Sequence, residues 1–308
     1  MKFWVGVTDN RWFGFLRGKR LDEVNFWQPS AKPMFVNIEP GTPFFFKLKK
    51  PLNHIGGYGT FVSFVRLPLS LAWETFGEKN GAASLAEFAS MIRPLSPNPH
   101  NVNPEIGCTL LATPVFFDPD RFLNPPIDWA SNIVRGKSYD DTTVEGARLV
   151  EQVSVAPDVS QSLLAEGWHV GESVAAYSTP YLARARLGQG TFRALVTDAY
   201  NRKCAITGEN ILPVLEAAHI RPFSEQGPHR MSNGLLLRSD FHKLFDLGYV
   251  TITPSLRIEV SRRIREEWVN GKAYYRFHGQ PLASSPGTPW GRPSAEYLQW
   301  HNDNRFQS

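Results

Sequence analysis

The segment between residues 204 and 248 limits the possible fold more than any other part of the chain. ILPVLEAAHI (211–220) predicts a strand that ends in a histidine, and NGLLLRSDFHKLFDLG (233–248) predicts a segment that becomes a helix stopped by Gly248. A loop containing Pro and Gly joins the two stretches. The sequence therefore predicts a small strand–loop–helix unit.

Three polar residues mark this unit. His219 ends the strand, Asn233 follows fourteen residues later, and His242 comes nine residues after that. Asp246 lies four residues beyond His242, so on a helix the two side chains share a face and can bind one divalent cation. Phosphodiester hydrolysis needs a base for water, a cation for the phosphoryl oxygens and a partner that orients the base. The pattern offers a candidate for each role.

The stretches LEAAHIRPF and NGLLLRSDFHKLFDLG resemble the HNH, or ββα-metal, nuclease family, in the zinc-less branch found in restriction endonucleases. The resemblance covers roughly residues 189–280. It implies that His219 is the general base, Asn233 the orienting residue and His242 a metal ligand. It also implies a divalent metal ion, Mg²⁺ first, with Mn²⁺, Co²⁺ or Ni²⁺ as alternatives.

One departure from the family concerns the metal. Many HNH domains carry Asp or His directly before the base as a second ligand, and here that residue is Ala218, which cannot ligate. Asp246 is the first candidate for the second ligand and Glu216 the next, with Asp240 as a weaker option. Asp246 could instead be only a cap partner or loop anchor at the helix end.

A second departure concerns structural zinc. Many HNH domains fold around a zinc ion held by four cysteines, but here Cys204 is followed by Thr207, Arg238 and Phe241 at the other three positions. We therefore expect no structural zinc, and packing around a buried Cys204. Arg238 and Arg193 are candidate phosphate contacts, with a solvated surface as the alternative. His229 and His301 fit no such pattern and are expected to be ordinary surface residues.

The first 150 residues are rich in predicted strands. FWVGVTD, FFFKLK, YGTFVSFVRL and CTLLATPVFF have strand composition, while SLAWETFG and SLAEFASMI have helical spacing, the latter with a Ser84–Glu87 capping pair. We expect an α+β protein with a first domain over 1–152, a partly helical linker over 153–188 and a nuclease domain with its tail over 189–308.

FWVGVTD, FFFKLKKPLNHIGGYGTF and ATPVFFDPDRFLNPPIDW resemble the EVE-like branch of the PUA superfamily. This resemblance implies a β-barrel-type domain whose aromatic pocket binds a modified base swung out of a nucleic acid. Unstacking costs a few kcal/mol, and aromatic faces restore about 1–3 kcal/mol per base. The candidate aromatic walls of this pocket are Trp12, Trp27 and Tyr58, and the candidate contact to the polar edge of the base is Asn53. The backbone could approach the nucleic acid closely at three glycines, Gly56, Gly57 and Gly59.

Together the two resemblances imply a type IV-like, modification-dependent restriction endonuclease. The first domain would flip and bind 5-methyl- or 5-hydroxymethylcytosine in double-stranded DNA, and the second would hydrolyse the backbone. Cutting both strands needs two sites, which favours a homodimer. Two alternatives remain: an HNH endonuclease whose first domain reads unmodified DNA or RNA, and a non-catalytic nucleic-acid-binding protein, suggested by Ala218.

Composition adds few limits. The net charge of +4 and pI near 9.0 permit binding to a polyanion without requiring it. No apolar run approaches the roughly 20 residues of a membrane span, and the start has no signal-peptide layout, so we expect a cytoplasmic protein without membrane partners. Cys108 and Cys204 are far apart and give no disulfide framework.

Overall fold

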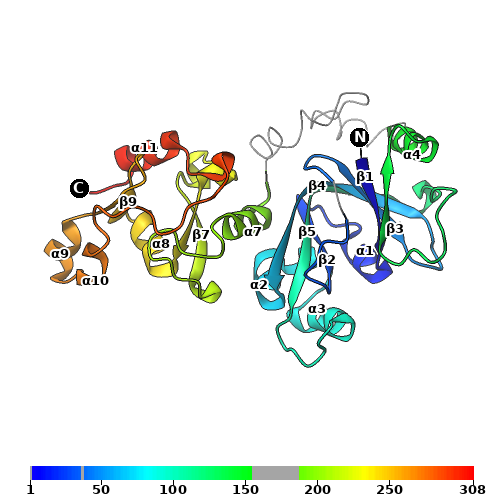
Figure 1. The fold of residues 1–308 in the computed structure, drawn as a ribbon, viewed down its shortest axis with the longest axis horizontal. Coiled ribbons are helices and arrows are strands. Elements are labelled where there is room, and N and C mark those ends of the chain that lie inside the picture. The colour runs from blue at the N-terminus through cyan, green and yellow to red at the C-terminus, as the bar shows by residue number, and fades with distance from the viewer. Residues whose placement is uncertain (1, 36–37, 155–186) are drawn as a thin grey trace. The chain divides into compact units, whose positions relative to one another are not determined.

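The computed structural model describes residues 2–35, 38–154 and 187–308, which belong to two compact units (Figure 1). The division falls between Leu182 and Ala183. The linker expected over 153–188 therefore lies almost wholly outside the described residues. Both units combine helices and strands, which confirms the α+β class. No helix in the described ranges is long and apolar enough to cross a membrane.

The N-terminal unit is built on one six-stranded sheet of order β2-β5-β4-β3-β1-β6. β1 and β3 pair in parallel, and the other neighbours pair antiparallel. Register shifts in the β3–β4 and β4–β5 pairs mark bulges, which bend a sheet and increase its twist. The strands are β1 (Lys2–Thr8), β2 (Glu23–Gln28), β3 (Pro43–Leu48), β4 (Ile55–Pro68), β5 (Glu105–Phe116) and β6 (Gly136–Asp140).

The sheet separates two hydrophobic cores. Successive side chains of a strand point to opposite faces, and Phe44 and Phe46 of β3 pack in one core while Phe45 packs in the other. Both faces are covered, so β3 is apolar at almost every position, in keeping with the sequence FFFKLK. Lys47 is the polar exception in this strand and is 4% exposed.

Short helices surround this sheet. Ser84 caps α3 as expected, because its hydroxyl accepts from Glu87 N at 3.2 Å while the Glu87 carboxylate accepts from Ala83 N at 2.8 Å. Sequence reasoning missed α1, which Asp9 caps through Arg11 N, and it missed strands β2 and β6. The helices are α1 (Asn10–Leu16), α2 (Leu69–Phe76), α3 (Leu85–Ile92) and α4 (Val144–Ser154), with 3-10 turns at Gly77–Asn80, Arg93–Leu95 and Pro119–Arg121.

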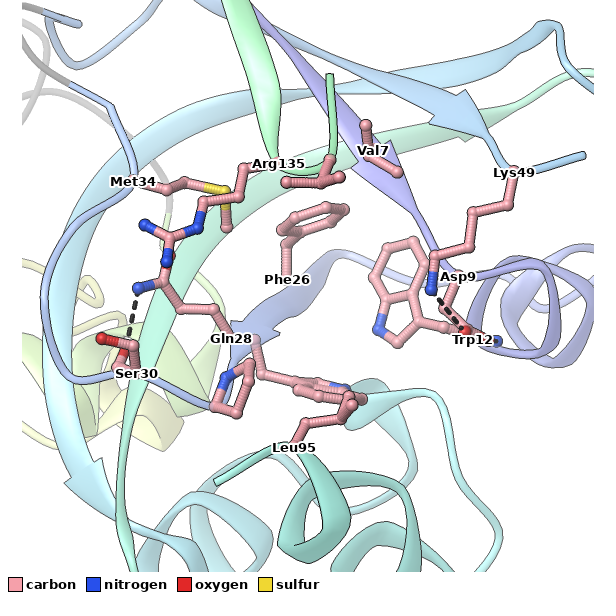
Figure 2. Close-up of a pocket in the computed structure, with 13 residues that line it drawn as sticks. Val7, Asp9, Trp12, Phe26, Gln28, Ser30, Met34, Lys49, Leu95 and Arg135 are labelled. Atoms are coloured by element: carbon pink, nitrogen blue, oxygen red, sulfur yellow. Dashed lines mark hydrogen bonds and ion pairs between the residues drawn. The ribbon is translucent and has the colours of Figure 1, made fainter. Parts of the chain in front are cut away.

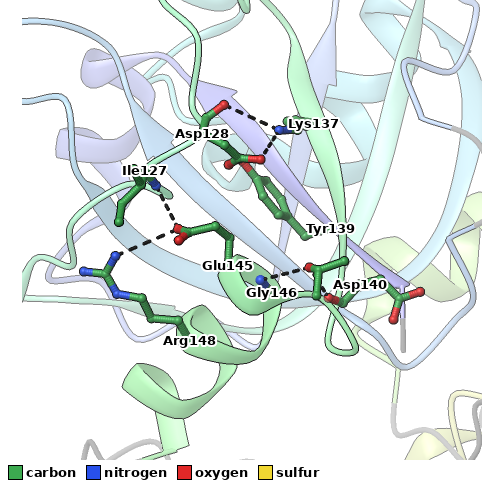
Figure 3. A network of polar contacts seen from close by, with 9 residues as sticks. Ile127, Asp128, Lys137, Tyr139, Asp140, Glu145, Gly146 and Arg148 are labelled. Carbon is green, nitrogen blue, oxygen red and sulfur yellow. Dashed lines mark hydrogen bonds and ion pairs between the residues drawn. The ribbon is translucent and has the colours of Figure 1, made fainter.

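A polar network fixes the stretch around residues 125–140 (Figure 3). Asp128 accepts from Lys137 Nζ at 2.5 Å and from Tyr139 Oη at 2.8 Å, and Glu145 accepts from Ile127 N at 2.8 Å. These bonds tie the loop to β6 and α4. Burial, and then the hydrogen bond to Asp128, raise the pKa of Tyr139 above its ordinary value.

The C-terminal unit packs short strand pairs against helices. The predicted strand at 211–220 begins only at Leu215, and Gly234–Arg238 is a strand paired with it before the helix starts at Ser239. The elements are α7 (Gln189–Ala199), β7 (Leu215–His219), β8 (Gly234–Arg238), α8 (Ser239–Asp246), β9 (Val250–Ile252), β10 (Ile258–Val260), α9 (Arg263–Trp268), α10 (Lys272–Tyr275) and α11 (Ala295–Asn304), with 3-10 turns at Leu212–Val214, Phe223–Glu225, Met231–Asn233 and Pro289–Gly291. β9 and β10 pair antiparallel.

Candidate active site

His219 lies at the end of β7, opposite Gly234 of β8. Its ring stacks on Phe192 of α7, with centroids 4.0 Å apart and planes 15° apart. Gly234 allows β8 to start directly against α7, because a Cβ there would lie 2.5 Å from Val196 Cγ2. The local packing therefore fixes the plane of the His219 ring.

The environment of His219 keeps its ring neutral. Burial, followed by the positive charges of His229 and His242, lowers its pKa from 6.5 to about 4. At neutral pH the ring is uncharged, so one of its two nitrogens has a lone pair that can accept a proton. Among the residues that the structure describes, Nδ1 of His219 has no hydrogen-bond partner, while Nε2 has one.

That partner is His229, which the sequence analysis wrongly treated as an ordinary surface residue. His229 Nδ1 lies 2.9 Å from His219 Nε2, and the ring stacks on Phe223 with centroids 4.7 Å apart. If the Nε2–H of His219 donates to His229, Nδ1 of His219 is left with a free lone pair. The sequence signal that could have revealed this is the place of His229 in the loop between His219 and Asn233.

Asn233 is fully buried and spans the same loop. Its Oδ1 accepts from Arg221 N at 2.9 Å, and its Nδ2 donates to the carbonyls of Arg221 and Pro228, both at 3.0 Å. The amide thus holds both ends of the loop, including the residue next to His229. The orienting role inferred for Asn233 from the sequence stays a prediction.

His242 lies on α8 between two carboxylates. Its Nδ1 is 2.5 Å from Glu216 Oε2 of β7, and its Nε2 is 3.5 Å from Asp246 Oδ2, one helical turn further on. Both carboxylate side chains are about half exposed, at 49%. The structure therefore brings together all three residues proposed as ligands, whereas Ala218 is fully buried in the core.

The donors suit a divalent ion but do not form a finished cage. Within the described parts of the chain, no group of three or more His, Cys, Asp or Glu side chains is arranged to hold a metal. Glu216 and Asp246 lie at different ring nitrogens of His242. The 3.5 Å gap between His242 Nε2 and Asp246 Oδ2 would leave room for an ion, whereas the direct 2.5 Å contact between Nδ1 and Glu216 Oε2 would have to open to admit one. Either pair would leave other coordination positions for water or phosphate oxygens.

The positions of the family's zinc cysteines are filled by hydrogen bonds and packing. Sγ of the buried Cys204 accepts from the backbone N–H groups of Thr207 at 3.4 Å and Arg238 at 3.3 Å, and Phe241 is fully buried beside it in the core. Arg238 forms two hydrogen bonds of 2.7 Å with Asp240. This pairing occupies the carboxylate of Asp240, the weaker candidate for a metal ligand. It also occupies the guanidinium of Arg238, which was expected to contact a phosphate. Arg193 lies on α7 and is half-buried.

In the N-terminal unit, two of the four candidate base-pocket residues line one cavity of about 350 Å³. Trp12 and Trp27 form part of its wall, with Asp9, Gln28, Lys49 and Arg135 as polar neighbours (Figure 2). Trp12 is 3% exposed and donates from Nε1 to Asn25 O at 3.2 Å. The sequence predicted two of the three aromatic residues of this lining, but neither Phe26 nor these polar neighbours, which come from separate segments.

The other pocket candidates lie elsewhere. Tyr58 is 1% exposed in the core on the opposite face of the sheet from Trp12, because strand alternation directs it there. Asn53 lines a different cavity. Gly57 is needed for strand packing rather than for approach to a nucleic acid, since a Cβ would lie 2.1 Å from Val115 O. The prediction that Tyr58 and Gly57 lie at the base pocket is therefore wrong.

The C-terminal unit thus has a strand pair followed by a helix, with a neutral histidine at the strand end and a second histidine on the helix. This arrangement is that of a ββα nuclease. Residues 204–253 match the HNH endonuclease family, so the chain carries an HNH endonuclease domain and is a nuclease that acts on DNA.

Comparison with solved structures finds loose similarities at low sequence identity. The "Modification dependent TagI restriction endonuclease" is 14% identical over 97% of this chain and 80% of its own, with a TM-score of 0.28. ASCH from Zymomonas mobilis is 10% identical over 48% of this chain and 94% of its own, with a TM-score of 0.33. A tyrosine-to-phenylalanine mutant of that ASCH protein is 10% identical over 48% of this chain and 96% of its own, with a TM-score of 0.31. No curated protein matches the chain.

Proposed function

We propose that this nuclease cuts DNA that carries a modified cytosine, held in the N-terminal unit after it swings out of the duplex. The observation that carries the proposal is the cavity lined by Trp12 and Trp27, which joins aromatic and apolar walls to a few polar groups. Such walls recover the stacking that a flipped base loses, about 1–3 kcal/mol per base.

The polar wall of the cavity suits cytosine. Burial acts to raise the pKa of Asp9, but hydrogen bonds from Lys49 and from Arg11 N outweigh it and keep the carboxyl ionised. A carboxylate is a good acceptor for the exocyclic amino group of cytosine, which thymine lacks. The apolar side chains of Met34, Leu95 and Val134 line the same cavity and could contact a 5-methyl group.

In the C-terminal unit, His219 is the general base that takes a proton from the attacking water through Nδ1. His229 accepts the hydrogen bond from its Nε2–H and so keeps the required tautomer. Asn233 holds the loop that carries His229. His242 with Glu216 or Asp246 would hold the divalent ion, Mg²⁺ first, which when bound supplies positive charge to the phosphoryl and leaving oxygens.

Cleavage of both strands of a duplex requires two such sites. We therefore include a homodimer, or two molecules that meet on DNA, in the proposal. Linearisation of a plasmid without accumulation of the nicked form, with a rate that rises with protein concentration, would support this arrangement.

The test of the function is digestion of three otherwise identical plasmids that carry cytosine, 5-methylcytosine or 5-hydroxymethylcytosine, with Mg²⁺ or Mn²⁺. We expect cleavage of at least one modified plasmid and little cleavage of the unmodified one. Trp27→Ala should remove this preference, with Trp73→Ala, outside the cavity lining, as the matched control. Equal digestion of all three plasmids would refute modification dependence while leaving the nuclease in place.

A further inference from the structure

A second cavity of the N-terminal unit, of about 580 Å³, adjoins the aromatic one. It lies between the end of β3 with the turn that follows and the stretch around residues 125–133. Three lysines line it, Lys47, Lys49 and Lys50, and its lining includes no acidic residue. Lys49 is paired with Asp9 at 3.1 Å, so the positive charge that the cavity lining does not neutralise is that of Lys47 and Lys50.

Lys47 is the most unusual of these residues. It is 4% exposed, and its ammonium group donates to Asn53 Oδ1 at 2.7 Å and to Leu48 O at 3.0 Å, both neutral acceptors. Among the described residues it forms no ion pair. Burial, and then the charge of Lys50, lower its pKa. A buried cation beside another cation is unfavourable, and an anion in the cavity would relieve both effects.

The remaining hydrogen-bonding capacity also suits an anion. An ammonium group has three N–H donors, and two of those of Lys47 are used. The Asn53 amide accepts through Oδ1, which leaves its NH₂ group as a donor. The indole of Trp129 lies 5.4 Å from Lys47 Nζ and closes one side of the cavity.

The two cavities share Val7 and Lys49 as lining residues. An anion in the second cavity would therefore lie next to a base in the first. In a nucleotide the group attached to the base through the sugar is a phosphodiester, which carries one negative charge and accepts several hydrogen bonds. Backbone phosphates are the groups through which proteins fix their position on DNA.

We propose that the cavity formed by Lys47, Lys50, Asn53 and Trp129 binds a backbone phosphate next to the base held in the aromatic cavity. This inference rests on the proposed function, because it assigns the backbone of the same DNA. Lys47 would then be a binding residue, and its buried charge would be matched only in the complex with DNA.

The test uses the full chain made inactive by His219→Ala, with fluorescence anisotropy on duplexes carrying one modified or one unmodified cytosine over a series of salt concentrations. Lys47→Met should weaken binding about tenfold at low salt and reduce the slope of log K against log salt by about 0.9, the value for one lost phosphate contact. Lys47→Arg should keep the slope. Lys19→Met, outside both cavities, is the matched control.

A folding defect can be distinguished from a binding defect. Lys47→Met removes an unpaired buried charge, so its melting temperature should equal or exceed that of the parent. Binding of Lys47→Met with the affinity and slope of Lys19→Met would overturn the inference. Calorimetric binding of inorganic phosphate that depends on Lys47, with an unchanged DNA slope, would also overturn it, in favour of a free anion. If the parent binds both duplexes equally while Lys47→Met lowers the slope on each, the modified-base proposal fails and the phosphate site stands.

Discussion

Two histidines of the C-terminal unit have similar surroundings and different connections. His219 at the end of β7 stacks on Phe192 with centroids 4.0 Å apart, and His301 on α11 stacks on Phe245 with centroids 3.7 Å apart, both at 15°. Burial is the main cause that lowers the pKa of each from 6.5 to about 4. Stacking and pKa alone therefore do not separate the two.

The hydrogen-bond partners of the ring nitrogens distinguish the two histidines. His301 Nε2 donates to Phe245 O at 3.0 Å, and its Nδ1 accepts from Thr251 Oγ1 at 2.8 Å, so both nitrogens are used inside the protein. His219 has His229 at Nε2, and among the described residues Nδ1 has no partner. A buried neutral histidine is available to a substrate only when one lone pair is left open. The expected surface position of His301 is wrong, since this residue is 1% exposed.

The largest expected effect is the loss of nuclease activity when His219, rather than His301, is replaced. His219→Ala should lower kcat about 10²–10⁴-fold, the usual loss for a general base, with DNA binding unchanged. The measurement is single-turnover cleavage of a substrate plasmid, with anisotropy for binding. Cleavage at a rate close to that of the wild type would remove His219 from the proposed role.

The reverse variant should change stability rather than chemistry. His301→Ala removes the stack and two buried hydrogen bonds and should destabilise the unit by about 2–4 kcal/mol, with kcat unchanged at temperatures where the protein is folded. Urea unfolding followed by fluorescence measures this, and Gln299→Ala, on an exposed position of α11, is the control. A fall in kcat of the folded variant would break the distinction drawn between the two histidines.

His229 gives a smaller and more specific effect. His229→Ala should lower kcat about tenfold through loss of the preferred His219 tautomer, with little change in KM. His229→Asn, whose Oδ1 can stand near the position of Nδ1, should recover most of that loss. Removing the charge of His229 should also move the acid limb of the pH profile upward, because that charge helps to lower the pKa of His219. Equal activity of the alanine and asparagine variants would argue against the hydrogen bond.

The same two histidines should also make stability depend on pH. Both histidines have a folded-state pKa of about 4 against 6.5 when unperturbed, so between these values the unfolded chain binds protons that the folded chain does not. Their contribution is complete above pH 6.5 and is lost as the pH falls toward 4, by up to about 1.4 kcal/mol per pH unit for each group. Urea unfolding at mildly acidic and at neutral pH should show a smaller difference for His301→Ala than for the wild type.

The candidate site could be predicted largely from the sequence, because its chemistry is local. His219, Asn233 and His242 are set by a strand end, a loop and a helix within one short segment, and the spacing i, i+4 is enough to place Asp246 beside His242 on one helix face. His229 was missed because its role depends on the path of a loop, which Asn233 fixes through backbone contacts that leave no periodic pattern.

The base pocket, in contrast, could not be predicted from local sequence. Trp12 and Tyr58 are both aromatic and both near predicted strands, and composition could not decide which faces the cavity. The sheet determines which residue faces the cavity, because Tyr58 points into the core on the other face. Trp12 lines the cavity with Asp9 and with Arg135, which comes from a distant part of the chain.

The sequence by itself determined the α+β class, the strand-rich first half and the residues of the nuclease motif, since hydrophobic periodicity and short spacings are local properties of the chain. Only the tertiary structure decided which histidine keeps an open lone pair, which aromatics share a cavity, and that a buried Lys47 faces a cavity without a counter-charge. These depend on contacts between residues far apart in sequence, and such contacts are set by the packing of the sheets and helices rather than by any local pattern.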